Sequence, residues 1–201
     1  RIQTSSPYEL VAMDLVSLPN TSGGYVACLV IVDHYSKWAG AVPIKNKTSR
    51  AVVDALNRNV FPYMLKLPTD VLTDNGPEFS SSLFNDYLES LNIGHRFITP
   101  EVPQANGACE RLNRTIQGFL RSLVENPSDW DEHVMRMLQV YNNTLHSELR
   151  MSPAEFLLSQ SHPYGGSTVH GNLNSVWKRG HPSFVPFALN QLVLKKVSAR
   201  G

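Results

Sequence analysis

The sequence predicts an α/β domain with a mixed five-stranded sheet flanked by helices. Three apolar runs with the character of strands come first, at 9–17, 25–33 and 38–44, and short links join them. Helical periodicity then alternates with two further short strand-like runs up to about residue 160. The chain of 201 residues is long enough for one domain with a sizeable core and a tail.

The first three runs predict an antiparallel meander. Residues 9–17 are apolar on both faces, as in a central strand. Residues 25–33 follow a Gly-Gly turn and form the strongest strand signal of the chain. Residues 38–44 contain Pro43, which favours a sheet edge or a strand end.

The pattern then changes to helical periodicity. Thr48 or Ser49 can cap a helix that runs to about residue 60, and residues 71–73 form a short strand that ends at Asp74. A helix is predicted over 80–91 and ends at Asn92 or Gly94. Its expected apolar face consists of Leu83, Phe84, Tyr87, Leu88 and Leu91.

Residues 95–99 predict the fifth strand, and the Pro- and Gly-rich residues 100–107 predict a loop. A long helix follows to about residue 125, then one over 129–142 and a short one from Pro153 to about residue 158. Residues 1–160 are therefore expected to form the main domain.

Composition predicts a linker over 161–186 and the beginning of a truncated β-element over 187–201. Residues 160–201 carry five basic residues and no acid, which leaves 13 bases and 17 acids, a net −4, in the preceding part. A basic C-terminal extension beside an acidic domain suggests contact with a polyanion, although a solvated tail explains the same pattern.

Several classes of protein are disfavoured. No run of 18 apolar residues predicts a membrane span, and the N-terminus lacks the pattern of a signal peptide. The abrupt start at Arg1 suggests a fragment of a longer protein. Two cysteines argue against a disulfide framework and fit a reducing compartment, and no Cys-x-x-Cys pair supports a structural zinc site.

Three acids predict a metal site. Asp14 lies inside the first apolar run, Asp74 follows a strand within TDNG, and Glu110 follows 35 intervening residues within NGACER. Carboxylates gathered from separate segments would repel one another, and divalent cations such as Mg²⁺ or Mn²⁺ compensate that repulsion. Two such ions can stabilise the attacking and leaving oxygens of a phosphodiester displacement.

Simpler roles exist for each acid and for several neighbours. Asp74 could only form a turn and Glu110 could only favour the helix dipole, whereas a buried strand acid such as Asp14 needs a specific partner. Asp33 is expected to be structural, and His34 and His146 to be surface or hydrogen-bonded residues. Trp38 and Trp130 are expected to be core anchors.

The chain resembles the catalytic core of retroviral and long-terminal-repeat retrotransposon integrases, especially the gypsy-like group. The matching stretches lie between residues 8 and 158, and they are MDLVSLP, VIVDHYSKWAGAVPIKNKTS, VLTDNGPEFSS, TPEVPQANGACERLNRTI and YNNTLHSELRMSPAEFLL. The resemblance implies an RNase H-like fold in which Asp14, Asp74 and Glu110 bind two Mg²⁺ or Mn²⁺ ions. It also implies 3′-end processing of the element's DNA and joining of that end to target DNA.

The same resemblance implies double-stranded DNA as partner, a homo-oligomer, no membrane association, and a nuclear location with cytoplasmic transit. The residues expected to grip DNA are Gln104, Asn106, Arg111, Arg114 and Gln117, although ordinary solvation explains them equally well. Where relatives read His-Pro-Gln, this chain has Val102-Pro103-Gln104, which puts handling of the DNA end in doubt. Two alternatives remain open: a domesticated, catalytically silent module that binds DNA or protein, and an RNase H-type nuclease without strand transfer.

Overall fold

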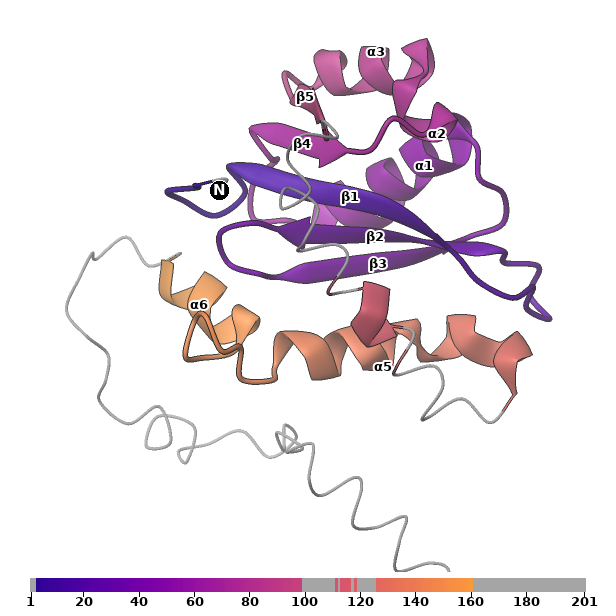
Figure 1. The fold of residues 1–201 in the computed structure, drawn as a ribbon. Helices are drawn as coiled ribbons and strands as arrows, with labels where there is room; N and C mark the ends of the chain where they lie inside the picture. The colour runs from indigo at the N-terminus through magenta and orange to yellow at the C-terminus, as the bar shows by residue number, and fades with distance from the viewer. Residues whose placement is uncertain (1–2, 99–110, 112, 117, 119–125, 161–201) are drawn as a thin grey trace, which may run out of the picture. The chain divides into compact units, whose positions relative to one another are not determined.

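The structure, a computed structural model, describes residues 3–98, 111, 113–116, 118 and 126–160 of the chain. Five strands form one sheet in the order β3-β2-β1-β4-β5 (Figure 1). The strands are β1 Leu10–Ser17, β2 Ala27–Asp33, β3 Ala39–Ile44, β4 Asp70–Thr73 and β5 Gly94–Phe97. β1, β2 and β3 pair antiparallel, whereas β1–β4 and β4–β5 pair parallel. The predicted mixed sheet and its meander are confirmed.

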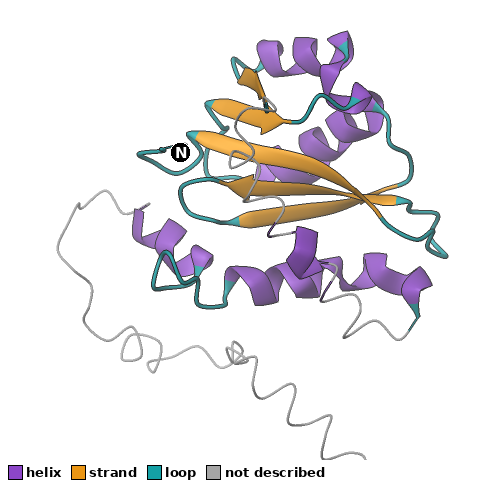
Figure 2. Cartoon of the chain, viewed as in Figure 1, coloured by secondary structure: helices purple, strands orange, loops and turns teal. Residues whose placement is uncertain are grey.

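Helices cover both faces of this sheet (Figures 1 and 2). On one face, α1 (Ser49–Ala55), α2 (Pro77–Ser80) and α3 (Ser82–Ser90) pack over a core that includes Met13, Ile31 and Phe84. On the other face, α5 (Trp130–Asn142) packs over a second core that includes Ala12 and Trp130. Because side chains alternate along β1, successive residues of this strand enter the two cores in turn.

The first helix departs from its prediction beyond Ala55. Thr48 caps it as expected, because its hydroxyl accepts a hydrogen bond of 3.3 Å from the amide of Ala51. The chain then widens into a π-helical turn at Leu56–Val60 and tightens into a 3₁₀ turn at Phe61–Tyr63. Pro62 explains the change, because a proline has no amide proton and its ring opposes a regular α-helical turn.

The helix predicted over 80–91 is interrupted near its start. Ser81 is extended at φ −72° and ψ 152°, and its hydroxyl caps α3 by accepting from the Phe84 amide at 3.2 Å. Pro77 begins the separate short helix α2. Leu83 is 39% exposed, so its place on the buried face was wrong, whereas Phe84 and Leu88 are buried. Asn92 ends the helix in a left-handed conformation, at φ 56°.

The C-terminal half of the described chain follows the prediction. The described residues 111, 113–116 and 118 are helical, and Ile116 is buried in the second core; this segment is called the Asn113 helix below. α6 spans Pro153–Gln160 and begins with a capping box between Ser152 and Glu155, whose paired bonds measure 2.9 and 3.2 Å. The predicted linker 161–186 and β-element 187–201 lie outside the described residues, and no described helix is long and apolar enough to cross a membrane.

Candidate metal centre

Asp14 lies on β1, and Asp74 follows the end of β4, the parallel neighbour of β1. The pairing of these strands runs from Leu10–Asp70 to Ala12–Leu72. Each acid lies two residues beyond that last pair on its own segment. Adjacent strands lie about 4.8 Å apart, so the two acids follow neighbouring stretches of backbone in the same direction.

Asp14 lies on the face of the sheet that α5 covers. Ala12, two residues before it on β1, belongs to the second core, and Asn113, which binds its carboxylate, lies on the helix that adds Ile116 to that core. Leu72, two residues before Asp74, also belongs to the second core, and Asp74 itself begins the turn after β4.

The carboxylate of Asp14 is half-buried and fixed from two sides. Its Oδ1 accepts a hydrogen bond of 2.8 Å from the amide of Leu15, and its Oδ2 accepts one of 2.6 Å from Nδ2 of Asn113. The carbonyl Oδ1 of Asn113 is buried without a hydrogen-bond partner among the described residues. A buried acceptor of this kind calls for a donor or a cation. Carboxylate and amide oxygens such as those of Asp14 and Asn113 are ligands that suit Mg²⁺ or Mn²⁺.

The sequence places Asn113 on the same helix face as Glu110, because residues three positions apart lie together, but it was not assigned a role at the site. The contact with Asp14 shows that the Asn113 helix lies beside β1. Glu110 itself lies outside the described residues, as do Gln104, Asn106 and Gln117. Among the residues that the structure describes, no three His, Cys, Asp or Glu side chains gather where they could hold a metal ion.

Asp74 is exposed at the start of a tight turn. Its Oδ1 accepts a hydrogen bond of 3.1 Å from the amide of Gly76, so the turn-forming role is present. A Cβ at position 76 would meet Cδ of Glu78 at 2.9 Å and Oδ1 of Asp74 at 3.1 Å. The closest of these atoms is the far end of a flexible side chain and φ of Gly76 is −57°, so the turn that holds one carboxylate oxygen of Asp74 does not depend on glycine.

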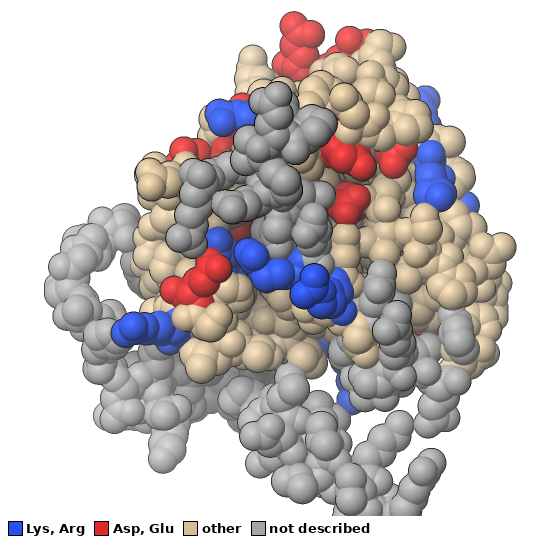
Figure 3. Space-filling model, viewed as in Figure 1, with Lys and Arg blue, Asp and Glu red and all other residues tan. Residues whose placement is uncertain are grey.

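Arg111 and Arg114 are exposed on the Asn113 helix. Figure 3 shows basic and acidic side chains close together on the face that it presents. Exposed guanidinium groups on the helix that contacts Asp14 can attract phosphates.

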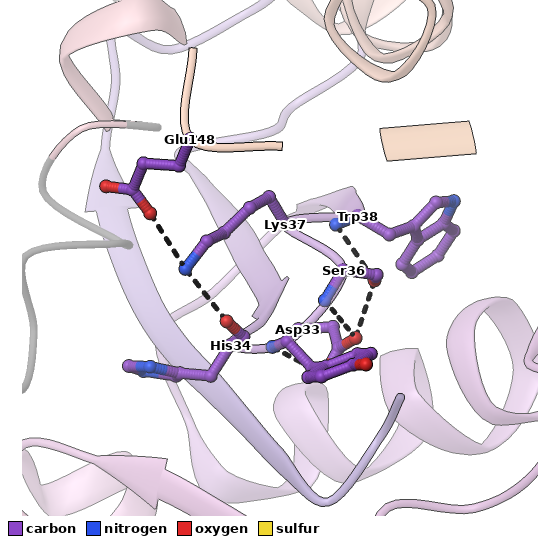
Figure 4. A network of polar contacts seen from close by, with 7 residues as sticks. Asp33, His34, Ser36, Lys37, Trp38 and Glu148 are labelled. Atoms are coloured by element: carbon purple, nitrogen blue, oxygen red, sulfur yellow. Dashed lines mark hydrogen bonds and ion pairs between the residues drawn. The ribbon is translucent and has the colours of Figure 1, made fainter. Parts of the chain in front are cut away.

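A polar network fixes the hairpin between β2 and β3 (Figure 4). The buried carboxylate of Asp33 accepts hydrogen bonds from the amides of Tyr8 at 3.1 Å and Ser36 at 2.9 Å, which shows a structural role. Burial, followed by the charge of Asp33, raises the pKa of Tyr8 to about 12. Lys37 Nζ donates to the carbonyl of His34 at 2.9 Å and lies 3.3 Å from a carboxylate oxygen of Glu148.

The charges of this network extend to the Asn113 helix. Burial opposes ionisation of Glu148, but the charges of Lys37 and Arg111 outweigh it and the pKa of Glu148 falls below its usual value. Burial also lowers the pKa of His146, against the attraction of Glu148. Arg111 therefore lies within electrostatic reach of the segment around Glu148.

The remaining candidates are structural. Trp130 is 1% exposed and its indole nitrogen donates to the carbonyl of Pro19 at 2.7 Å, and Trp38 packs edge-on against Tyr8. Cys28 is a free, buried thiol whose pKa burial raises to about 12, which makes it a poor nucleophile and a poor metal ligand.

Comparison with known proteins decides the family. Residues 4–103 match the family described as Integrase core domain. The Transposon Tf2-3 and Tf2-4 polyproteins of Schizosaccharomyces pombe are each 33% identical to the chain over 153 residues, which is 75% of the chain and 11% of each polyprotein. The chain belongs to the integrase core domain family. It spans about a tenth of the length of these curated relatives.

Solved structures show the same fold for this integrase core. A chain of the simian T-cell lymphotropic virus intasome has a TM-score of 0.64 at 22% identity, covering 81% of this chain and 58% of that one. The HTLV-2 integrase catalytic core domain, solved in complex with magnesium, has a TM-score of 0.56 at 21% identity, covering 75% and 96%. The BIV integrase core gives 0.59 at 21%, covering 75% and 94%. The predicted RNase H-like fold is confirmed.

Proposed function

We propose that the chain is the catalytic core of a metal-dependent polynucleotidyl transferase that processes DNA 3′ ends and joins them to target DNA. The observation that supports this proposal is the parallel pairing of β1, which carries Asp14, with β4, which Asp74 follows. Family membership supports the class of reaction, and the carboxylates supply the means to perform it.

In this proposal Asp14, Asp74 and Glu110 hold two Mg²⁺ or Mn²⁺ ions. Bound there, the ions would activate the attacking oxygen and neutralise charge that develops on the phosphate. Asn113 holds the Asp14 carboxylate in one orientation, and its buried Oδ1 remains available to a ligand of the site. The amide of Gly76 holds Asp74. Glu110, three residues before Asn113, would complete the set from the same helix face.

DNA is the proposed substrate, bound through its backbone. Arg111 and Arg114 are exposed on the Asn113 helix and would contact phosphates, while Gln104, Asn106 and Gln117 would contact phosphates or terminal bases. A homo-oligomer is proposed as the working form, because joining two DNA ends together requires more than one site. The trimeric form named for the HTLV-2 core and the intasome of the simian virus support assembly of related chains.

A strand-transfer assay with Mn²⁺ and a short duplex tests the function. Asp74→Asn keeps the size of the side chain and removes its charge, so joined product should fall by more than the ~10–100-fold typical of residues around a metal site. Asp86→Asn is the matched control, because Asp86 is an exposed carboxylate on α3. Its activity should equal that of the unaltered chain.

The outcomes separate the alternatives. Equal activity of Asp74→Asn and the unaltered chain would refute the assigned role. DNA binding without joining under either metal would favour the catalytically silent module. Cleavage without joining would favour the nuclease.

A further inference from the structure

A series of hydrogen bonds connects Asn85, His95 and Thr73 to the backbone of Asp74. Thr73, the last residue of β4, is fully buried, and its hydroxyl donates to the carbonyl of Asp74 at 2.8 Å. The same hydroxyl oxygen lies 2.8 Å from Nε2 of His95 on β5. Nδ1 of His95 lies 2.7 Å from Oδ1 of Asn85 on α3. Three elements are thus connected to the backbone of Asp74.

This series of hydrogen bonds lies on the opposite face of the sheet from the Asp14 carboxylate. His95 pairs in register with Val71, which belongs to the first core, and Thr73 lies two residues further on the same face. Phe84 contacts the His95 ring edge-on at 5.2 Å between ring centres, and Phe97 lies at 4.2 Å. The imidazole ring is therefore held by packing as well as by hydrogen bonds.

The direction of the hydrogen bonds follows from their partners. Nδ2 of Asn85 donates to the carbonyl of Ser81 at 3.0 Å, so Oδ1 of Asn85 faces His95 as an acceptor. Nδ1 of His95 must then carry a proton, whichever form the ring takes. A protonated Nε2 donates to the Thr73 hydroxyl oxygen while that hydroxyl donates to the carbonyl of Asp74, whereas a neutral ring makes Nε2 an acceptor that competes with this carbonyl for the single hydroxyl proton. Burial lowers the pKa of His95, which favours this neutral form.

The position of the Asp74 carboxylate depends on the hydrogen bonds that fix its side chain and its backbone. Asp74 is exposed, and within the described part of the chain its side chain is held by the Gly76 amide. The backbone on the other side is fixed by the Thr73 hydroxyl and by the amide of Ile98, which donates to the carbonyl of Thr73 at 2.8 Å. A misplacement of about 1 Å at a reacting group can cost ~100-fold in rate.

We propose that His95 is a positioning residue for Asp74. Acting through the Thr73 hydroxyl, it holds the end of β4 so that the Asp74 carboxylate stays in register with Asp14. The proposal rests on the metal-dependent function assigned to these carboxylates. It places the control of the Asp74 carboxylate on the face of the sheet that α1, α2 and α3 cover.

The first test uses the unaltered protein and no activity. Nuclear magnetic resonance of ¹⁵N-histidine-labelled protein should find His95 protonated at Nδ1, either as the neutral Nδ1–H tautomer or as the imidazolium. A neutral His95 with its proton on Nε2 would overturn the proposal, because Nδ1 could then not donate to Oδ1 of Asn85. This result does not depend on the catalytic function.

The second test removes the connection without removing volume. Thr73→Val deletes the hydroxyl and Thr73→Ser restores it, while His95→Phe keeps an aromatic ring between Phe84 and Phe97. In Mn²⁺-dependent strand transfer, Thr73→Val and His95→Phe should each lower kcat by ~10–100-fold with little change in the KM for DNA. Thr73→Ser should recover most of the activity. The double variant should be no worse than either single one, because both act through one connection.

The outcomes are separable from those of the proposed function. A chain with no Mn²⁺-dependent joining at all refutes the function, whereas normal kcat in Thr73→Val within an active chain refutes the positioning role. Additive losses in the double variant also refute it. In folded His95→Phe, the backbone ¹³C shift of the Asp74 carbonyl should move, and an unchanged shift contradicts the proposal even if activity falls.

Discussion

Asn142 joins α5 to the exposed edge of the sheet, and its removal should destabilise the whole domain. Its Oδ1 accepts from the amide of Ala39 at 2.9 Å, and its Nδ2 donates to the carbonyl of Ala39 at 2.8 Å. Because β3 is an edge strand, this amide takes the place of a neighbouring strand. Both residues are buried, and α5 carries Trp130 over the face on which Asp14 lies.

Asn142→Ala would leave a buried N–H and a buried C=O without partners. Each unsatisfied group costs about 1–3 kcal/mol, and partial entry of water reduces the sum, so we expect a loss of about 3 kcal/mol in the free energy of unfolding. For a domain of this size that corresponds to a fall in Tm of about 6–12 °C. Urea unfolding followed by circular dichroism measures the free energy directly.

Asn143→Ala is the matched control at the next position. Asn143 is exposed, and its amide donates to the carbonyl of Gln139 at 2.8 Å within the same helix. Its loss should cost less than about 1 kcal/mol. If Asn142→Ala and Asn143→Ala lower stability equally, the amide of Asn142 does not act as the partner of the edge strand.

Three further predictions concern the site and its surroundings. Asn113→Ala removes the bond to Asp14, so Mn²⁺ affinity measured by calorimetry should fall ~10–100-fold, and an unchanged affinity would count against its role. Glu148→Gln should lower stability by less than about 1 kcal/mol at pH 7, because the ion pair with Lys37 is partly exposed. The pKa of Glu148 is lowered in the folded chain, so the loss of stability in Glu148→Gln is present above the ordinary pKa of 4.5 and should vanish as the pH falls below that value. A loss of stability that persists in acid contradicts the pairing. Burial raises the pKa of Cys28 to about 12, so iodoacetamide at pH 8 should modify it only after unfolding, and mass spectrometry of native protein would detect any earlier reaction.

The apolar patterns of the sequence predicted the sheet because its central strands are buried. β2 is buried at every position, and such a run of apolar residues has few alternatives to a central strand. Thr48 and Asn92 were recognised as helix ends because their local chemistry is strong enough to act without tertiary contacts. The acids Asp14 and Asp74 were likewise singled out from their local settings, and their role at a metal site stays a prediction.

Features that depend on contacts between distant segments could not be predicted. The break at Ser81 and the exposure of Leu83 reflect how α2 and α3 pack, which helical periodicity does not encode. The bonds of Asn142 to Ala39 cross 103 positions of sequence, and those of Asn113 to Asp14 cross 99. Polar residues on a helix look solvated in sequence until their partner on another element is known.

A diffraction experiment on crystals soaked in Mn²⁺, with anomalous scattering to locate the ions, tests the central claim most directly. The carboxylates of Asp14 and Asp74 should share at least one Mn²⁺, at metal–oxygen distances close to the ~2.0–2.2 Å found for small divalent cations with oxygen ligands. Two carboxylates that point apart, with Mn²⁺ bound to neither or to one alone, would contradict the account.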